Sequence, residues 1–310
     1  MRARIASIQY RFRHIDDWDG FANQVGFVLN AAADYKPHFV LLPEIFTTQL
    51  LSCMQNDDVY SAVRELAGYT DRYVELMRKY AVADNYYLIG GSHPTLRDGK
   101  LYNTAYLFTP RGEVFTQDKL HRTRWEKDEW KTDHGDSLQV FETEHGRIAI
   151  LVCYDIEFPE LARRVAELGT EIIFVPSCTD DRQGFLRVRY CCHARAIENQ
   201  VYVVMTSTVG NLPAEGLRLH YGQAAIITPS DFPFARDGIA AEGVINEEQI
   251  VVADVDLHLL DENRLKGTTI PLLDKRSDFY SLTAPVIVDV RGAAGKQEAE
   301  VASAPASASV

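Results

Sequence analysis

The sequence predicts a single α/β domain built around a layered, mixed sheet. Two observations favour this fold class in the 310-residue chain. Short runs rich in aliphatic and β-branched residues recur along it, and most are apolar throughout, which is typical of strands buried on both faces. Amphipathic helical patterns fall between these runs with no long linker, so we expect strands and helices to form one layered unit.

The strands are expected at the apolar runs. In chain order they cover residues 4–9, 39–44, 86–91, 103–110, 147–153, 171–177, 201–207, 224–230 and 250–257. The stretch "NTAYLFTPRGEVFTQDK", residues 103–119, contains the short turn "PRG" and is therefore predicted to be an antiparallel hairpin. The sheet should then contain both parallel and antiparallel pairs.

Apolar residues at helical spacing predict four helices between the strands. The four stripes are Phe21, Val25, Val28 and Ala32; Leu66, Tyr73, Met77 and Ala81; Leu161, Val165 and Leu168; and Leu186, Tyr190, Ala194 and Ile197. Each stripe covers one helix face, so each helix is expected to lie on the sheet. Pro159 suits the first turn of the third helix, and Gly169 follows its end.

Charge and composition argue against several classes of protein. The net charge of −12 argues against a nucleic-acid or anionic-membrane partner, because phosphate binding needs a basic surface. No apolar run reaches the roughly 18 residues of a membrane helix, and "MRARIASIQYRF" lacks the apolar stretch of a signal peptide. The five cysteines show no metal-ligand spacing. We therefore expect a soluble, cytoplasmic protein with free thiols and no metal.

The end of the chain has a different composition. After Val290, the segment "RGAAGKQEAEVASAPASASV" is dominated by small and polar residues. Such a segment buries too little apolar surface to offset the entropy of ordering its backbone. We therefore assign residues 1–285 to the folded domain and predict that residues 286–310 form a disordered tail.

Three reactive side chains stand where predicted strands end. Glu44 ends "FVLLPE", Lys119 ends the hairpin, and Cys153 ends "RIAILVC". Because α/β sheets bind ligands at the carboxyl ends of their strands, we expect these groups to meet in one pocket. Lys119 and the helix that begins near Pro159 favour the nucleophilic thiolate, and Glu44 can take the thiol proton. The trio predicts attack on a carbonyl-type carbon, an oxyanion facing Lys119, and a thioester that Glu44 helps water to hydrolyse.

Each of the three residues also has a structural interpretation. Cys153 can be a small buried apolar residue, Glu44 can cap a loop, and Lys119 can be an ordinary charge at a hairpin end. Taken singly, these interpretations are simpler. Three complementary groups at three strand ends favour the catalytic interpretation.

The segments around these residues resemble a known family. "LPEIF", "DKLH" and "CYDIEFPELAR" are similar to the three signature segments of the nitrilase superfamily, the carbon–nitrogen hydrolases, in order and in spacing. "PSCTDD", "ARAIENQVYVV" and "YGQAAIITPSDF" extend the likeness over roughly residues 3–285. The resemblance implies a four-layer α-β-β-α sandwich, a homodimer or higher homo-oligomer, and no metal or organic cofactor.

The resemblance also implies roles for individual residues. It places a Glu–Lys–Cys triad on Glu44, Lys119 and Cys153. It adds a second glutamate shortly after the lysine, for which Glu126 is the best match and Glu129 the reserve. The "CYD" segment is similar to the amidase and carbamoylase branches, which implies a small linear amide or carbamoyl substrate. The alternatives are a nitrilase that releases acid and ammonia, an enzyme that passes the acyl group to an amine, and a non-catalytic binding member of the fold.

Residues beside the triad are candidates for the substrate pocket. Tyr154, Cys178 and Thr179 are assigned to substrate binding, and the backbone amide of Tyr154 can contribute to the oxyanion site. Their structural alternative is core packing. Asp155 and Glu157 precede the third helix and are expected to cap it.

His121 and the arginines of one predicted helix can each be interpreted in two ways. His121 stands beside Lys119 and is an alternative base for the thiol, or a residue behind the site. The arginines of "FLRVRYCCHARAIEN" either bind a substrate carboxylate or form salt bridges on a solvated helix face.

Overall fold

The computed structural model describes residues 1–54, 58–212 and 219–282. The chain divides into two compact units, Met1–Leu272 and Leu273–Val310. The first unit holds every strand of the described ranges, and the description of the second ends with helix α8 (Ser277–Leu282). The predicted tail, residues 286–310, lies outside the described residues, so the domain boundary at 285 stays a prediction.

The strands of the first unit form one mixed sheet in the order β5-β4-β3-β2-β1-β9-β8-β7-β6. The strands are β1 (Arg2–Phe12), β2 (Phe39–Leu41), β3 (Tyr87–Arg97), β4 (Lys100–Phe108), β5 (Val114–Asp118), β6 (Val140–Thr143), β7 (Gly146–Ile150), β8 (Ile172–Ser177), β9 (Tyr202–Asn211), β10 (Leu219–His220), β11 (Ala225–Ile227), β12 (Ile239–Glu242) and β13 (Gln249–Asp256). Each of the nine predicted runs contains a strand, and β4 and β5 form the predicted antiparallel hairpin. The short strands β6, β10 and β12 were not predicted.

The central strand β1 joins two halves of this sheet. It pairs in parallel with β2 on one side and with β9 on the other. Phe39 on β2 and Phe174 on β8 have ring centroids only 5.4 Å apart, although β1 and β9 separate their strands in the sheet. The two halves therefore pack face to face, with one continuous apolar core between them.

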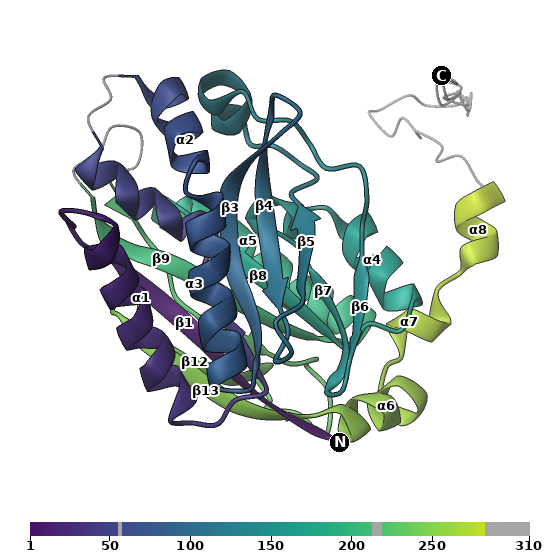
Figure 1. Ribbon diagram of the computed structural model, residues 1–310. Helices are drawn as coiled ribbons and strands as arrows, with labels where there is room; N and C mark the ends of the chain where they lie inside the picture. Colours follow the sequence, from purple (N-terminus) through teal and green to yellow (C-terminus); the bar gives the residue numbers. More distant parts are fainter. Residues whose placement is uncertain (55–57, 213–218, 283–310) are drawn as a thin grey trace, which may run out of the picture. The chain divides into compact units, whose positions relative to one another are not determined.

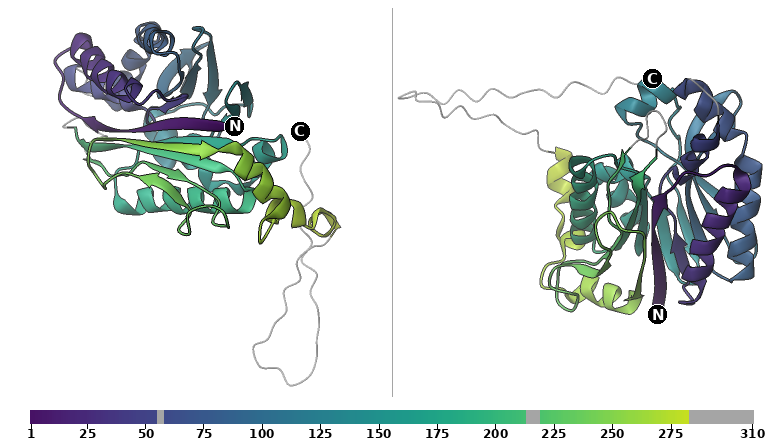
Figure 2. Two further views of the ribbon diagram at one scale, coloured as in Figure 1. Left: turned by 90° about the horizontal axis from the view of Figure 1, so that it is seen from below. Right: turned by 90° about the vertical axis from the view of Figure 1, so that its left-hand side faces the viewer.

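Helices cover both outer faces of this pair of half-sheets. The α-helices of the described ranges before α8 are α1 (Trp18–Ala33), α2 (Val59–Ala67), α3 (Thr70–Ala83), α4 (Pro159–Glu167), α5 (Arg182–Asn199), α6 (Leu257–Lys266) and α7 (Pro271–Asp274), whose residues fall in both units. A second apolar cluster fixes α1 and α3 onto the first half, and α4 and α5 pack on the second (Figures 1 and 2). The predicted α-β-β-α layering is confirmed.

Two of the predicted helical stripes were wrong, and a third is buried only in part, because Leu168 is exposed at the end of α4. The stripe from Leu66 to Ala81 is split between α2 and α3, because the chain turns at Gly68 and Tyr69 between them. On α5, Tyr190 and Ile197 of the predicted buried stripe are exposed. The buried face of α5 instead carries Phe185, Val188, Cys192, Arg195, Ala196 and Asn199. Because this buried face includes polar side chains with specific contacts, the spacing of apolar residues alone does not predict it.

Candidate active site

The structure brings the three predicted reactive side chains together. Glu44 lies three residues after β2, Lys119 directly after β5, and Cys153 three residues after β7. Lys119 Nζ is 2.8 Å from Glu44 Oε1, and all three residues line one cavity of about 800 Å³. The carboxyl ends of strands from both half-sheets therefore converge on this cavity.

Glu126 completes the ion-pair network. Its Oε2 lies 2.8 Å from Lys119 Nζ and accepts a 2.8 Å hydrogen bond from the backbone N–H of Thr123. The Thr123 hydroxyl in turn accepts from the backbone N–H of Glu126 at 3.3 Å, which is the reciprocal pattern of a capping box. The reserve candidate, Glu129, is exposed, so the structure joins Glu126 to the lysine and leaves Glu129 outside.

Two more groups hold the carboxylates in place, and the sequence did not reveal either. The backbone N–H of Cys178, directly after β8, donates to Glu44 Oε2 at 3.0 Å. Asn103 Nδ2, on β4, donates to both Glu44 Oε1 and Glu126 Oε1 at 2.9 Å. Glu44 is thus fixed by donors from three separate segments of the chain.

The nucleophile candidate sits on a sharp turn. Cys153 has φ +49°, in the left-handed region that side chains other than glycine seldom adopt. It begins a 3-10 turn, Cys153–Glu157. Arg195 on α5 donates to the carbonyl oxygens of Ile156 and Glu157 at 3.0 and 3.1 Å. The arginine therefore secures the end of this turn, a role that neither interpretation of the helix arginines foresaw, and it also forms an ion pair with Glu198 at 3.1 Å, in keeping with the salt-bridge interpretation.

The predicted capping role of Asp155 and Glu157 was wrong. Phe158 occupies the cap position of α4, and no side chain of the described residues caps the start of this helix. Asp155 is buried and instead accepts hydrogen bonds from the backbone N–H groups of Leu120 and His121, at 3.1 and 2.8 Å. These donors follow Lys119 directly, so Asp155 ties the lysine segment to the turn that carries Cys153.

The surroundings divide the charges among these side chains. Burial alone lowers the pKa of Lys119, but Glu126 and Glu44 raise it well above its ordinary value, so the ammonium stays charged. Burial raises the pKa of Glu44 against the pull of Lys119. Burial works in the same direction on Glu126, yet Lys119 and Asn103 hold the pKa of that carboxyl below its usual value.

The resting state of the thiol differs from the expectation. Burial, followed by the charge of Glu44, raises the pKa of Cys153 well above its ordinary value, and the opposing effect of Lys119 is smaller. The sequence had suggested that Lys119 and the helix start would favour a thiolate. Desolvation outweighs both at this buried sulfur, so the thiol carries its proton at rest.

Comparison with known proteins agrees with this geometry. The model of the carbon–nitrogen hydrolase family matches residues 4–264. The chain belongs to this family. The protein named "Probable hydrolase YhcX", from Bacillus subtilis, is 49% identical over 280 residues, which are 90% of this chain and 55% of that protein. The chain thus spans about half the length of this relative.

Two further matches come from more distant members. Omega-amidase NIT2 of Xenopus tropicalis is 34% identical over 209 residues, which cover 63% of this chain and 70% of that protein. The crystal structure of Nit3 from Saccharomyces cerevisiae, a member of branch 10 of the nitrilase superfamily, matches with a TM-score of 0.71 at 23% identity, covering 86% of this chain and 96% of that one. The predicted superfamily is confirmed.

In this member of the carbon–nitrogen hydrolase family, the residues predicted to bind substrate also line the cavity. Tyr154, Cys178 and Thr179 all line it. The Cys178 thiol lies 3.5 Å from His220 Nδ1 and 3.2 Å from Thr208 Oγ1, which donates to it. Burial raises the pKa of Cys178 to about 12. This second thiol therefore keeps its proton and lines the cavity. Substrate binding by Tyr154, Cys178 and Thr179 stays a prediction.

The remaining candidates fall outside the network. His121 contacts Asp155 through Nδ1 at 3.0 Å and stacks on Phe158 with ring centroids 3.5 Å apart, so these contacts place it behind the site. Arg187 lines the cavity, 3.8 Å from Glu157. Arg189 turns away and pairs with Glu242.

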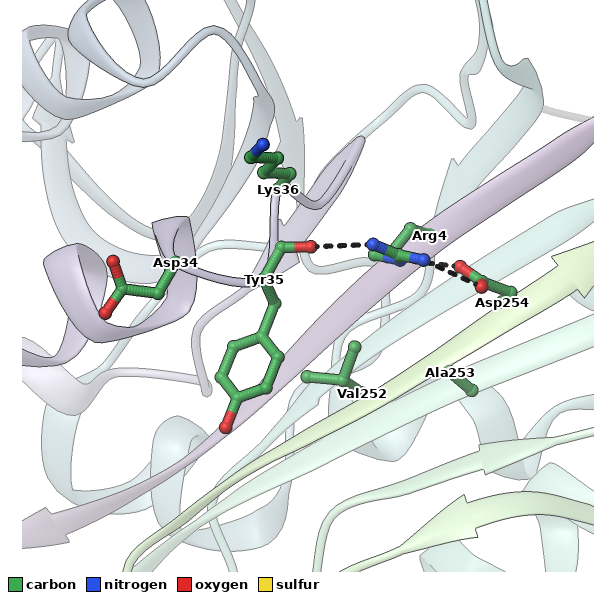
Figure 3. A pocket seen from close by; sticks show the side chains of 7 residues that line it. All are labelled: Arg4, Asp34, Tyr35, Lys36, Val252, Ala253 and Asp254. Carbon is green, nitrogen blue, oxygen red and sulfur yellow. Dashed lines mark hydrogen bonds and ion pairs between the residues drawn. The ribbon is translucent and has the colours of Figure 1, made fainter.

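A second pocket lacks a comparable set of reactive side chains. A pocket of about 440 Å³ is lined by Arg4, Asp34, Tyr35, Lys36, Val252, Ala253 and Asp254 (Figure 3). Its guanidinium is already paired with Asp254, at 2.7 and 3.0 Å. Within the described ranges, no cluster of histidine, cysteine or acidic side chains could hold a metal ion, and no helix is long and apolar enough to cross a membrane.

Proposed function

We propose that the chain is a thiol-dependent hydrolase that cleaves a C–N bond, other than a peptide bond, in a small linear amide or carbamoyl compound. The observation that carries this proposal is the buried network of Lys119 between Glu44 and Glu126, beside Cys153 in one cavity. A buried cation shared by two carboxylates costs desolvation energy. An active site gives this network a function that a purely structural core lacks.

The first half of the reaction forms a thioester. The sulfur of Cys153 bonds to the carbonyl carbon of the substrate while its proton passes to Glu44. The carbonyl oxygen becomes an oxyanion that faces the ammonium of Lys119 and the backbone amide of Tyr154. The C–N bond then breaks, and Glu44 returns the proton to the departing nitrogen, which leaves as ammonia or an amine.

The second half releases the acid. Water enters the position that the nitrogen has vacated, and Glu44 removes one of its protons as the oxygen attacks the thioester. The C–S bond breaks and the Cys153 sulfur regains a proton. Glu126 stays charged and holds Lys119 in place through both halves, in keeping with its lowered pKa.

Several observations favour an amide over a nitrile. The name omega-amidase for a relative 34% identical to this chain supports an amide substrate, as does the "CYD" segment around Cys153. A nitrilase activity is the second candidate. A panel of paired amides and nitriles, assayed for ammonia release, separates the two, because only an amidase releases ammonia from the amide faster than from its nitrile.

The nucleophile is tested directly by Cys153→Ala. We expect turnover to fall by at least about 10⁴-fold, with the circular dichroism spectrum unchanged. Cys53→Ala is the matched control, because that thiol lies outside the cavity residues. A slow amide or ester substrate should leave an acyl adduct on Cys153 in peptide mass spectra. An adduct on Cys178 instead, or normal turnover by Cys153→Ala, contradicts the assignment.

We also propose that the protein is a homodimer or higher homo-oligomer. The outward stripe on α5, with Tyr190 63% and Ile197 44% exposed, offers apolar surface that a second copy could cover. Light scattering on the purified protein tests this. A monomer at micromolar concentration contradicts it, and Tyr190→Glu should weaken the assembly if α5 lies in the interface.

A further inference from the structure

Asn103 contacts all three residues of the ion-pair network, Glu44, Lys119 and Glu126. Its side chain is buried, and Nδ2 donates to Glu44 Oε1 and to Glu126 Oε1, both at 2.9 Å. Its backbone carbonyl accepts from the backbone N–H of Lys119, also at 2.9 Å. One residue of β4 therefore touches both carboxylates and the lysine between them.

The orientation of the Asn103 amide follows from its neighbours. Turning the amide over would point Oδ1 at two carboxylate oxygens, so only Nδ2 can face them. In the described part of the chain, the buried Oδ1 has no hydrogen-bond partner. An unpaired buried oxygen costs stability. This cost makes Asn103 a poor choice for stability alone and points to a role for its two donated bonds.

Those two bonds fix the geometry around Lys119. Lys119 Nζ already bridges Glu44 Oε1 and Glu126 Oε2 at 2.8 Å. The NH2 group of Asn103 bridges the same two carboxylates through Glu44 Oε1 and Glu126 Oε1. Two bridges, one from an ammonium and one from an amide, prevent either carboxylate from rotating or moving toward the other. Hydrogen bonds to a carboxylate also favour its charged form.

We propose that Asn103 is a positioning residue of the reaction, whose amide sets the spacing of Glu44 and Glu126 about Lys119 and keeps both carboxylates charged. The inference rests on the proposed function, because it matters for catalysis only if Glu44 is the base for Cys153. Loss of the amide removes a donor from both charged groups. Glu44 then takes up its own proton at higher pH, and the fraction of enzyme that can deprotonate the thiol falls.

The test compares Asn103→Leu, which has no donor, with the wild type and with Tyr106→Phe. Tyr106 lies on the same strand and its hydroxyl bonds to Thr95 at 2.8 Å, away from the network, so it controls for the loss of a buried hydrogen bond on β4. Two readouts are used: the pH dependence of kcat/KM on an amide, and the pH dependence of Cys153 alkylation by iodoacetamide, followed by peptide mass spectrometry. The second needs no turnover.

For Asn103→Leu we expect the acid limb of both profiles to move up by about one pH unit, the shift that corresponds to losing a charge-assisted hydrogen bond. At pH 7, kcat should fall about 10- to 100-fold while KM changes less than about threefold. Tyr106→Phe should keep the wild-type acid limb. A merely structural role would lower the folded fraction and leave the acid limb of the folded enzyme unmoved.

The outcomes separate this inference from the proposed function. A shifted alkylation profile in a protein that hydrolyses no amide supports Asn103 and contradicts the amidase. If the wild type hydrolyses amides but the alkylation profile of Asn103→Leu is not shifted, the amidase is supported and the role of Asn103 is contradicted. If Asn103→Leu does not fold, the smaller Asn103→Ala is measured in its place. Failure of both to fold, with Tyr106→Phe folded, makes Asn103 a structural residue and overturns the proposal.

Discussion

Replacement of Lys119 by methionine is the sharpest perturbation of the buried network. Lys119 is 3% exposed and lies 2.8 Å from a carboxylate oxygen on each side. Methionine keeps the length of the side chain but leaves two buried carboxylates without their cation. Removing one partner of a buried ion pair typically costs about 3–5 kcal/mol of unfolding free energy, and activity should be lost as well.

The cost of Lys119→Met should depend on pH with a definite sign. Burial already raises the pKa of Glu44, and the lysine opposes this shift, so its removal raises that pKa further. A carboxyl whose folded pKa lies above its unfolded value destabilises the fold when it is ionised. The protein regains that stability as the pH falls through the raised pKa and the group takes up a proton. The loss should shrink by up to about 1.4 kcal/mol per pH unit in that range.

Urea denaturation of the wild type and Lys119→Met between pH 8 and pH 5 measures this dependence. Lys127→Met, which changes an exposed lysine of the neighbouring turn, should stay within about 0.5 kcal/mol of the wild type. The double variant Lys119→Met/Glu126→Gln removes one of the two unpaired charges and should be more stable than the single variant at pH 8. A stability loss that stays constant or grows toward pH 5 would refute the charge assignment.

Three other predictions follow from individual contacts. Asp155→Ala should lower kcat about 10-fold or more with KM little changed, because the backbone after Lys119 loses two hydrogen bonds. Steady-state kinetics on the folded variant test this, and an unchanged kcat would contradict it. Glu44→Gln should lower amide turnover at pH 7 at least about 100-fold, because the base that takes the proton of Cys153 is lost; turnover equal to that of the wild type would remove Glu44 as the base. At pH 8, iodoacetamide should label Cys153 in preference to Cys178, because burial raises the pKa of both thiols and only the Cys153 thiol is hydrogen-bonded to the proposed base Glu44; peptide mass spectra report both sites.

The strand ends could be predicted from the sequence because buried strands appear there as continuous apolar runs. Apolar runs mark strands enclosed by two layers, and a charged residue at the end of such a run stands out. Glu44, Lys119 and Cys153 were found in this way. Asn103 was not, since a polar residue at the start of an expected strand looks like an ordinary boundary. Its contacts with Glu44 and Glu126 are set by tertiary structure, 59 and 23 residues away along the chain.

Asp155 and the helix α5 were misread for a related reason. An acidic residue before a proline-started helix is a common cap, but the donors that Asp155 accepts from lie about 35 residues earlier in the chain, next to Lys119. On α5, Arg195 is buried because it bonds the carbonyl oxygens of the Cys153 turn. Local patterns describe exposure to water, and they fail where a buried polar group has a distant partner.

The two glutamates illustrate how position assigns different roles to the same side chain. Both are buried and both bond Lys119, yet burial raises the pKa of Glu44 while Lys119, Asn103 and the Thr123 N–H lower that of Glu126. Environments that push two carboxyl pKa values apart separate the group that exchanges protons from the group that stays charged. Glu44 is therefore suited to take and return the Cys153 proton, and Glu126 to be the permanent counter-ion of Lys119. It follows that Glu44→Gln removes the proton acceptor, whereas Glu126→Gln leaves the acceptor in place and weakens the charge that holds the lysine.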